Sequence, residues 1–373
     1  MPPVVIDLRA CDDLRDVVVE AVQWLVQGKL VAFPTETVYG LAARALDAAA
    51  VERLLAVKGR QAGHALTLAI RGPDEARDFA PDMPPLALRL ARRCWPGPIT
   101  LVLDDSHPES AVRRLPRRVQ EAVSPSGTVG LRVPGHSVIL DVLQMIAGPL
   151  VLSSANRTGQ PEARTASDVV NALGTDVDLV LDDGPTRYGQ PSSVVRVRGK
   201  QYEVLRAGVV PEKTLRRLSS LMVLFVCAGN TCRSPMAEML FRKMAAERLG
   251  CAVEELEDRG VIVASAGLSA VSGMRAAPEA CQVVASLGLD LSMHETQALT
   301  ESLVRQADVI YTMTRAQRQG IAREWPHAAE RCKTLSLTGA DISDPIGGPV
   351  ERYQRCAEQI QAELAGRLSE LEW

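Results

Sequence analysis

An apolar strand that leads directly into a short polar loop and then a long helix begins at Met222, and it constrains the fold most strongly. The run Met-Val-Leu-Phe-Val is rich in β-forming residues, the loop 227–233 reads Cys-Ala-Gly-Asn-Thr-Cys-Arg, and residues 234–249 have helical periodicity. A strand whose end meets a helix N-terminus is the unit of parallel α/β sheets. We therefore expect a separate α/β domain over residues 222–373, beginning just after a boundary at 219–221.

Residues 1–218 show the same alternation of short apolar runs and helical stretches, which predicts a second α/β domain. Helices are expected at 13–27, 47–57 and 211–218, and Asp47 is placed to cap the second of them. The apolar runs expected to be strands are 30–34, 66–70, 99–103, 128–133, 149–153, 177–182 and a hairpin within 192–206.

Composition limits the functional classes open to the chain. With 373 residues, 46% hydrophobic and 23% charged, it is typical of a soluble globular protein with two cores. A net charge of -3 gives no general attraction to nucleic acids or membranes, and no apolar run approaches the roughly 18 residues of a membrane helix. The eight cysteines include no CxxC pair, which argues against a zinc ribbon or a disulfide framework. We expect a cytoplasmic protein with free thiols, no resident metal and no membrane partner.

The loop after the strand at Met222 has the residues of a phosphate cradle. A loop opening onto a helix N-terminus aims backbone N–H groups and the positive end of the helix dipole at one point. That field would hold Cys227 as the nucleophilic thiolate, and Arg233 could grip two phosphate oxygens. Gly229 allows close backbone approach, and Asn230 tolerates a left-handed conformation. Chance spacing is the alternative, but no other cysteine has an arginine six residues later.

Residues 222–373 resemble the low-molecular-weight protein phosphatases. The resemblance implies a doubly wound parallel sheet and a cofactor-free mechanism in which Cys227 attacks phosphorus. Asp344 would protonate the leaving group and then activate water. Ser234 would donate a hydrogen bond to the thiolate, and Cys232 could form a reversible disulfide with Cys227 or be a spectator thiol. The matching motifs are VCAGNTCRSPMAE at 226–238, SAGL at 265–268, ADVIYTMTRAQ at 307–317, and Asp344-Pro345.

Two features bear on which phosphoprotein this domain acts on. Phosphotyrosine members of the family carry an apolar β-branched residue where Thr231 stands, and aromatic residues after the Asp-Pro pair. This chain instead reads Asp-Pro-Ile-Gly-Gly at 344–348, and both features resemble the bacterial protein-arginine phosphatases. A threonine hydroxyl can hydrogen-bond near a guanidinium, and a Gly-Gly loop leaves no stacking wall. Phosphoarginine is therefore favoured over phosphotyrosine, with drift within a tyrosine-type enzyme as the alternative.

Polar loops of residues 1–218 carry a dispersed set of hydroxyl, amide and cationic side chains. Each short motif by itself is typical of a solvated surface. The motifs are FPTETVYGL at 33–41, Lys58-Gly59-Arg60, WPGPIT at 95–100, Gly130-Leu131-Arg132-Val133-Pro134, Ser153-Ser154-Ala155-Asn156, Pro191-Ser192-Ser193 and Leu205-Arg206. In order and spacing they resemble the YrdC family over residues 10–210, which implies a twisted mixed sheet with helices.

The YrdC resemblance implies a synthase that makes threonylcarbamoyl-adenylate from L-threonine, bicarbonate and ATP, with Mg²⁺ on the phosphates and release of pyrophosphate. The product feeds an adenosine modification in transfer RNA, so tRNA and the proteins of that pathway are indirect partners. The implied ATP contacts are Lys58, Arg60, His64, Thr128, Asn156 and Arg206. The implied threonine contacts are Thr37, Arg132, Ser154 and Ser192.

The segment after Arg60 departs from the YrdC pattern. The family has prolines in this stretch, whereas residues 61–66 read Gln-Ala-Gly-His-Ala-Leu, and Ala69 replaces a polar contact. A second interpretation therefore stays open, in which the first domain is an inactive nucleotide- or RNA-binding module attached to a phosphatase. Salt-dependent RNA affinity without adenylate formation would favour that interpretation.

Overall fold

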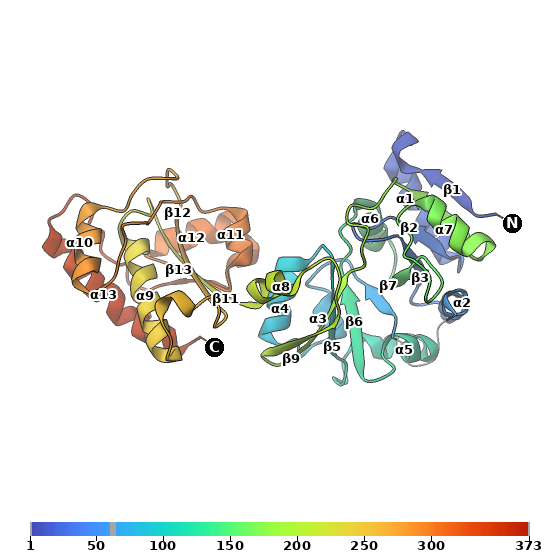
Figure 1. Cartoon of the computed structure of the whole chain (residues 1–373), viewed down its shortest axis with the longest axis horizontal. Helices are drawn as coiled ribbons and strands as arrows, with labels where there is room; N and C mark the ends of the chain where they lie inside the picture. Colours follow the sequence, from blue (N-terminus) through green and yellow to red (C-terminus); the bar gives the residue numbers. More distant parts are fainter. Residues whose placement is uncertain (1, 60–64, 372–373) are drawn as a thin grey trace. The chain divides into compact units, whose positions relative to one another are not determined.

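The structure is a computed structural model that describes residues 2–59 and 65–371 (Figure 1). The chain divides into two compact units, Met1–Leu218 and Ser219–Trp373, and each is described by itself. Within the described ranges, no helix is both long enough and apolar enough to cross a membrane.

The N-terminal unit is built on a ten-stranded mixed sheet in the order β1-β8-β2-β3-β7-β4-β6-β5-β9-β10. The sheet contains parallel pairs such as β4 with β6 and antiparallel pairs such as β3 with β7. The last two strands form the expected antiparallel hairpin. The strands are β1 Val4–Asp7, β2 Val31–Phe33, β3 Gly40–Arg44, β4 Thr67–Ala69, β5 Ile99–Asp104, β6 Thr128–Arg132, β7 Leu150–Ser154, β8 Leu179–Asp182, β9 Ser193–Arg198 and β10 Gln201–Arg206.

Helices cover both faces of this sheet because side chains alternate across each strand. Val31 and Phe33 of β2 pack against α1 and α6, whereas Ala32 joins the larger core beneath α2, α4, α5 and α7. Asp47 caps α2 by accepting a hydrogen bond from the Ala50 N–H. The helices are α1 Leu14–Val26, α2 Ala48–Lys58, α3 Ala76–Phe79, α4 Pro85–Cys94, α5 Arg117–Val123, α6 Ser137–Met145, α7 Ala166–Leu173 and α8 Glu212–Ser219.

Several elements of this unit are not among those expected from the sequence, and β3 is one of them. Residues 33–41 are expected to be a polar loop leaving a strand, but Gly40–Arg44 forms β3, paired antiparallel with β2. Its sequence, Gly-Leu-Ala-Ala-Arg, contains no β-branched or aromatic residue, so its strand propensity is low. Pairing with β2 on one side and β7 on the other decides its conformation.

The C-terminal unit is a four-stranded, all-parallel sheet in the order β12-β11-β13-β14. Its central strand β11 is buried along its whole length, which explains the unbroken apolar run that marks it in the sequence. The strands are β11 Leu221–Cys227, β12 Val261–Gly267, β13 Val309–Thr312 and β14 Cys332–Thr334. The helices are α9 Arg233–Leu249, α10 Pro278–Ser286, α11 Glu301–Gln306, α12 Arg315–Glu324 and α13 Val350–Ser369.

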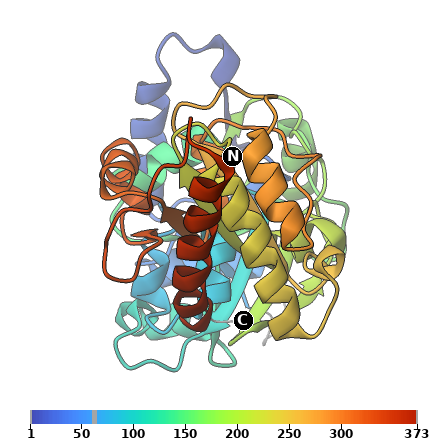
Figure 2. The same cartoon turned by 90° about the vertical axis from the view of Figure 1, so that its left-hand side faces the viewer.

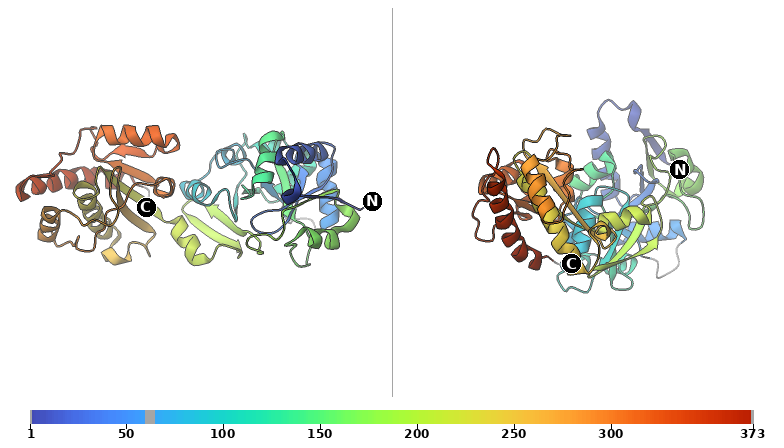
Figure 3. Two further views of the ribbon diagram at one scale, coloured as in Figure 1. Left: turned by 90° about the horizontal axis from the view of Figure 1, so that it is seen from above. Right: turned by 60° about the vertical axis from the view of Figure 1, so that its left-hand side comes forward.

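Alternate residues of β11 face two separate cores. Val223 and Phe225 pack with α9, α10 and α13, and the long helices α9 and α13 lie side by side (Figure 2). Leu224 and Val226 pack on the opposite face with α11 and α12 (Figure 3). Helices on both faces of a parallel sheet confirm the doubly wound fold, and the mixed sheet of the N-terminal unit confirms the α/β class there.

Candidate functional sites

The thiol of Cys227 stands at the carboxyl end of β11, where the loop 228–232 leads into α9. Its Sγ atom accepts a hydrogen bond from the Asn230 backbone N–H at 3.2 Å and lies 3.0 Å from Ser234 Oγ. Asn230 has φ of 57°, a left-handed conformation that brings its N–H toward the sulfur. The sulfur therefore lies at a helix N-terminus, beside a backbone N–H donor and a hydroxyl group, in a position where an oxyanion can also bind.

A set of buried polar groups fixes the conformation of this loop through Asn230. The Asn230 amide donates to Ser234 Oγ at 3.0 Å and to Ser265 Oγ at 2.9 Å, and its side-chain oxygen accepts the Gln297 N–H at 2.9 Å. His294 Nε2 lies 2.9 Å from the Asn230 carbonyl oxygen. No sequence motif indicated a role for Gln297 or His294, and the only signal for Ser265 was the SAGL segment that contains it.

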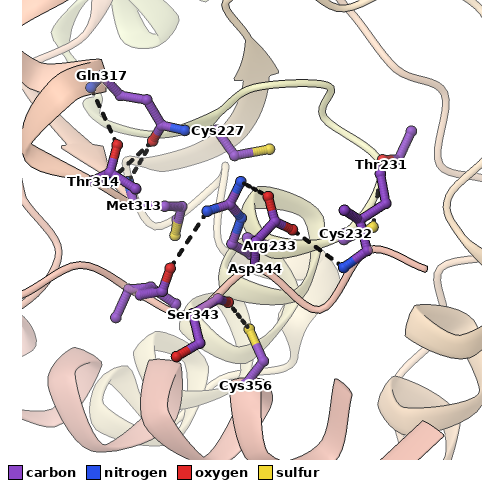
Figure 4. A network of polar contacts seen from close by, with 12 residues as sticks. Cys227, Thr231, Cys232, Arg233, Met313, Thr314, Gln317, Ser343, Asp344 and Cys356 are labelled. Carbon is purple, nitrogen blue, oxygen red and sulfur yellow. Dashed lines mark hydrogen bonds and ion pairs between the residues drawn. The ribbon is translucent and has the colours of Figure 1, made fainter. Parts of the chain in front are cut away.

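Arg233 and Asp344 meet beside the thiol (Figure 4). Arg233 Nη2 lies 2.5 Å from Asp344 Oδ2, and Nη1 donates to the Ile342 carbonyl oxygen at 3.4 Å. The arginine side chain is 7% exposed and the aspartate 43%, so the carboxylate is at the mouth of the site. The Ile346 N–H holds the other carboxylate oxygen at 3.2 Å. The general-acid candidate, assigned only by resemblance, therefore lies within reach of the phosphate cradle.

The second loop thiol, Cys232, is buried among polar groups. Its Sγ atom lies 3.4 Å from Thr231 Oγ1 and 3.5 Å from the hydroxyl of Tyr353 on α13. A third thiol, Cys356, donates to the Ser343 carbonyl oxygen at 3.3 Å, and burial raises its pKa to about 12. Cys356 is therefore an un-ionised thiol at neutral pH.

Close packing of the phosphate loop depends on Gly267 rather than on Gly229. A Cβ atom on Gly229 would meet only Thr231 Oγ1, at 3.6 Å, which is ordinary contact. A Cβ atom on Gly267 would lie 2.6 Å from the Ala228 carbonyl oxygen and 2.9 Å from the Asn230 nitrogen. A side chain at position 229 would therefore not clash with the protein. At position 267, by contrast, only glycine lets the phosphate loop pack against the end of β12.

A pocket in the N-terminal unit gathers residues from distant parts of the chain. It opens where β6 and β7 end, next to the connection between β2 and β3 and to the start of β9 and the end of β10. Four residues assigned by resemblance line it, namely Arg132, Ser154, Ser192 and Arg206. The other lining residues are Thr35, Val38, Tyr39, Gly40, Thr67, Thr100, Leu152, Ser153 and Pro191.

Two arginines give this pocket its positive charge. Arg132 Nη2 donates to Thr37 Oγ1 at 2.8 Å, which joins the implied threonine contact Thr37 to the pocket. Arg206 Nη2 donates to the Ser192 carbonyl oxygen at 2.9 Å and to its Oγ at 3.2 Å. Burial lowers the pKa of Arg206, and the nearby Arg132 charge acts in the same direction. Two guanidinium groups in one pocket that also contains hydroxyl groups suit a carboxylate or phosphate ligand.

Lys58 is a buried cation that holds the end of β7 in place. Its side chain is 3% exposed, and its ammonium donates to the Ser154 carbonyl oxygen at 2.7 Å and to Asn156 Oδ1 at 2.9 Å. It also contacts the carbonyl oxygen of Asn156 and lies 3.3 Å from Ser154 Oγ. The amide of Asn156 in turn donates to the Gln160 carbonyl oxygen at 2.6 Å. The structure thus connects Lys58 and Asn156 to the pocket through Ser154.

Of the implied ATP contacts that the structure describes, only Arg206 lines this pocket. Thr128 begins β6, at the opposite end of the strand from Arg132, and is not among the described residues that line the pocket. Arg60 and His64 lie outside the described residues. Within the described ranges there is no cluster of three or more His, Cys, Asp or Glu side chains that could hold a metal ion.

Two family models match the chain. Residues 23–208 match a family described as "Telomere recombination", and residues 222–372 match the low molecular weight phosphotyrosine protein phosphatases. The C-terminal part is 39% identical over 140 residues to the "Probable low molecular weight protein-tyrosine-phosphatase EpsP" of Ralstonia nicotianae, covering 37% of this chain and 88% of that protein.

The N-terminal part is similar to proteins named threonylcarbamoyl-AMP synthase. One, from Chromohalobacter salexigens, is 34% identical over 182 residues, covering 49% of this chain and 93% of that protein. Another, from Pyrococcus abyssi, is 36% identical over 198 residues, 53% of this chain and 56% of that protein, so the chain spans about half its length. The solved structure of P. abyssi Sua5 complexed with L-threonine matches with a TM-score of 0.52 and 27% identity, covering 70% of this chain and 92% of that one.

Proposed function

Because the chain belongs to both the threonylcarbamoyl-AMP synthase family and the low-molecular-weight protein phosphatase family, we propose that it is a bifunctional enzyme. One activity would form threonylcarbamoyl-adenylate for the modification of transfer RNA, and the other would dephosphorylate proteins. All eight cysteines are free thiols, which suits a reducing cytoplasm as the site of action.

The phosphatase proposal depends above all on the convergence of donors on Cys227 Sγ beside the Arg233–Asp344 pair. The thiolate attacks phosphorus, an S–P bond forms, and the bond from phosphorus to the leaving group breaks. Asp344 supplies the proton that the leaving group takes up. Water then attacks the phosphocysteine with Asp344 as base, releasing phosphate and restoring the thiolate. Arg233 neutralises the charge of the transferred group.

Phosphoarginine is the substrate class that the rim of this site favours. Ile346, two residues after the acid, is 64% exposed, and Gly347 follows with φ of 72°. The aromatic side chains of the unit within the described ranges stand in the cores, so none forms a wall beside Asp344: Phe225, Phe241, Tyr311, Trp325 and Tyr353. A phenol ring would find no stacking partner, whereas the Thr231 hydroxyl suits a polar guanidinium.

For the synthase, the main support is the pocket that combines Arg132, Arg206 and the hydroxyl groups of Ser154 and Ser192. Arg132 would bind the carboxylate of L-threonine, and Arg206 would neutralise phosphate charge, with bicarbonate and ATP as the other substrates. Mg²⁺ would enter with ATP as part of the substrate, because it binds through phosphates with only one or two carboxylates. The donor set of this pocket, mostly cations and hydroxyls, fits that arrangement.

A second candidate function follows from Lys58. Its ammonium already donates hydrogen bonds to protein oxygens, so its role can be structural. A domain that binds a nucleotide but does not catalyse a reaction could contain such a lysine. In that case the N-terminal unit is a nucleotide- or RNA-binding module that accompanies a phosphatase.

Pyrophosphate release by the full chain, with and without threonine and bicarbonate, separates the two candidates. Release that needs both co-substrates, with threonylcarbamoyl-adenylate identified as product, supports the synthase. ATP binding without release supports the binding module. Parallel assays with phosphoarginine and phosphotyrosine peptides test the phosphatase, and turnover of neither would contradict that half of the proposal.

A further inference from the structure

The carboxylate of Glu36 pairs with the pocket arginine but has no role in the function proposed above. Glu36 follows β2, and its side chain is 9% exposed, beside an Arg132 side chain that is 8% exposed. Arg132 Nη2 donates to Glu36 Oε1 at 2.7 Å. A buried carboxylate paired with a buried guanidinium is costly to separate, because either partner alone would be an uncompensated charge.

The second oxygen of this carboxylate is also bonded. The Gly135 N–H donates to Glu36 Oε2 at 2.8 Å, and the Glu36 carbonyl oxygen accepts the Tyr188 N–H at 3.0 Å. A Cβ atom on Gly135 would lie 3.1 Å from the carboxyl carbon of Glu36, so a larger residue would crowd this contact. The carboxylate therefore links Arg132 to the loop that leaves β6 and has both oxygens occupied by the protein.

Part of the Arg132 guanidinium has no hydrogen-bond partner among the described residues. Its Nη2 atom serves both Glu36 and Thr37, whereas its Nε atom is buried and has no hydrogen-bond partner among the described residues. Arg132 lines the pocket. An unpaired buried donor is unfavourable, and an oxygen of a substrate carboxylate can accept a hydrogen bond from it.

We propose that Glu36 is a positioning residue for the amino-acid substrate. By holding Nη2, it fixes the Arg132 side chain so that the guanidinium N–H groups without a protein partner can bind the carboxylate of L-threonine. In this proposal Glu36 itself does not touch the substrate, because it is not among the described residues that line the pocket. The inference rests on the proposed synthase function and adds a residue that acts through Arg132.

Glu36→Gln in the full chain tests this role, because glutamine keeps the size and one acceptor oxygen but removes the charge. We expect KM for L-threonine in pyrophosphate release to rise by about tenfold or more, as for loss of a charged hydrogen bond. We expect kcat and KM for ATP to change less than about twofold, because threonine positioning alone is affected. Glu36→Asp keeps the negative charge on a shorter side chain and should give an intermediate KM for L-threonine. It replaces Glu36→Gln as the test variant if the glutamine variant does not fold.

Glu75→Gln is a matched control. The Glu75 side chain is 10% exposed, pairs with Arg71 and accepts the Arg71 N–H, yet it is not among the described residues lining the pocket. Its KM for threonine should equal that of the wild type. A Glu36→Gln variant with unchanged KM overturns the inference. So does one with a lower KM, because Glu36 would then compete with the substrate for Arg132.

Thermal unfolding with and without L-threonine gives a readout that needs no turnover. Threonine should raise the Tm of the wild type and raise that of Glu36→Gln far less at the same concentration. If the wild type releases no pyrophosphate but threonine still raises its Tm, the synthase proposal fails. The difference in Tm shift between the wild type and Glu36→Gln then still tests the role of Glu36 in binding threonine. A full shift in Glu36→Gln, or none in the wild type, overturns the inference.

Discussion

The two candidate sites are assembled in opposite ways. In the C-terminal unit, Cys227, Asn230, Arg233 and Ser234 belong to one strand–loop–helix segment, and Asp344 is the only proposed catalytic group from elsewhere. In the N-terminal unit, the pocket residues come from strands far apart in sequence. A site within one segment keeps its geometry through local hydrogen bonds, whereas a dispersed site depends on the whole sheet being in register.

This difference predicts how activity and stability are coupled. Removing a reactive atom from the local site should abolish chemistry and leave folding unchanged. Removing a cation from the dispersed site should reduce both activity and stability, because such cations also hold strands together.

Cys227→Ser should lower phosphatase turnover by about ten-thousandfold or more, because the nucleophile is lost. Synthase activity and Tm should stay at the wild-type values. Cys251→Ser, a half-buried thiol at the end of α9, is the control and should keep full activity. Loss of adenylate formation in Cys227→Ser would show that the two sites are not independent.

Asp344→Asn should lower phosphatase kcat by about a hundredfold or more, the usual contribution of general acid catalysis. The loss should be smaller with p-nitrophenyl phosphate, whose leaving group needs little protonation. Asp341→Asn, in the same loop, retains the acceptor for the Arg315 N–H and is the control. An equal loss with both leaving groups would contradict the role of Asp344 as acid.

Lys58→Met should lower the free energy of unfolding of the N-terminal unit by about 1–3 kcal/mol, because it leaves buried carbonyl oxygens without a donor. Pyrophosphate release should fall with it. Denaturant unfolding beside the activity assay measures both, and Lys213→Met on the exposed face of α8 is the control. If Lys58→Met lost pyrophosphate release but kept the wild-type free energy of unfolding, Lys58 would have a catalytic role only. The proposed difference between the local and the dispersed site would then be weakened.

Thr231→Ile should change the ratio of phosphoarginine to phosphotyrosine turnover by about three- to tenfold toward phosphotyrosine, because isoleucine offers an apolar surface to the phenol ring and cannot hydrogen-bond to a guanidinium. Thr231 is half-buried at the loop edge, so Tm should not change. The kcat/KM ratio for two peptides of matched sequence measures this effect. An unchanged ratio would remove the Thr231 argument for phosphoarginine.

The contrast between the sites also explains what could be predicted from sequence. The strand, loop and helix around Cys227 could be predicted because residues close together in the sequence determine this local structure. The left-handed conformation of Asn230 is part of it. The contacts of Lys58 join residues 96 and 98 positions apart in the chain, which no local pattern encodes. The same holds for Glu36 and Arg132, 96 positions apart. Strand β3 escaped prediction because its neighbours in the sheet, and not its own residues, determine it.

The ion pair between Arg233 and Asp344 has a consequence for the catalytic cycle. While the site is empty, the arginine already has a counter-ion, so an arriving phosphate dianion must displace Asp344 to bind. The Asp344 side chain released in this exchange can then take up a proton and serve as the proposed acid, so substrate arrival also frees the group that would protonate the leaving group. When product phosphate departs, the pair re-forms, and this recovered interaction favours emptying the site over retention of the product.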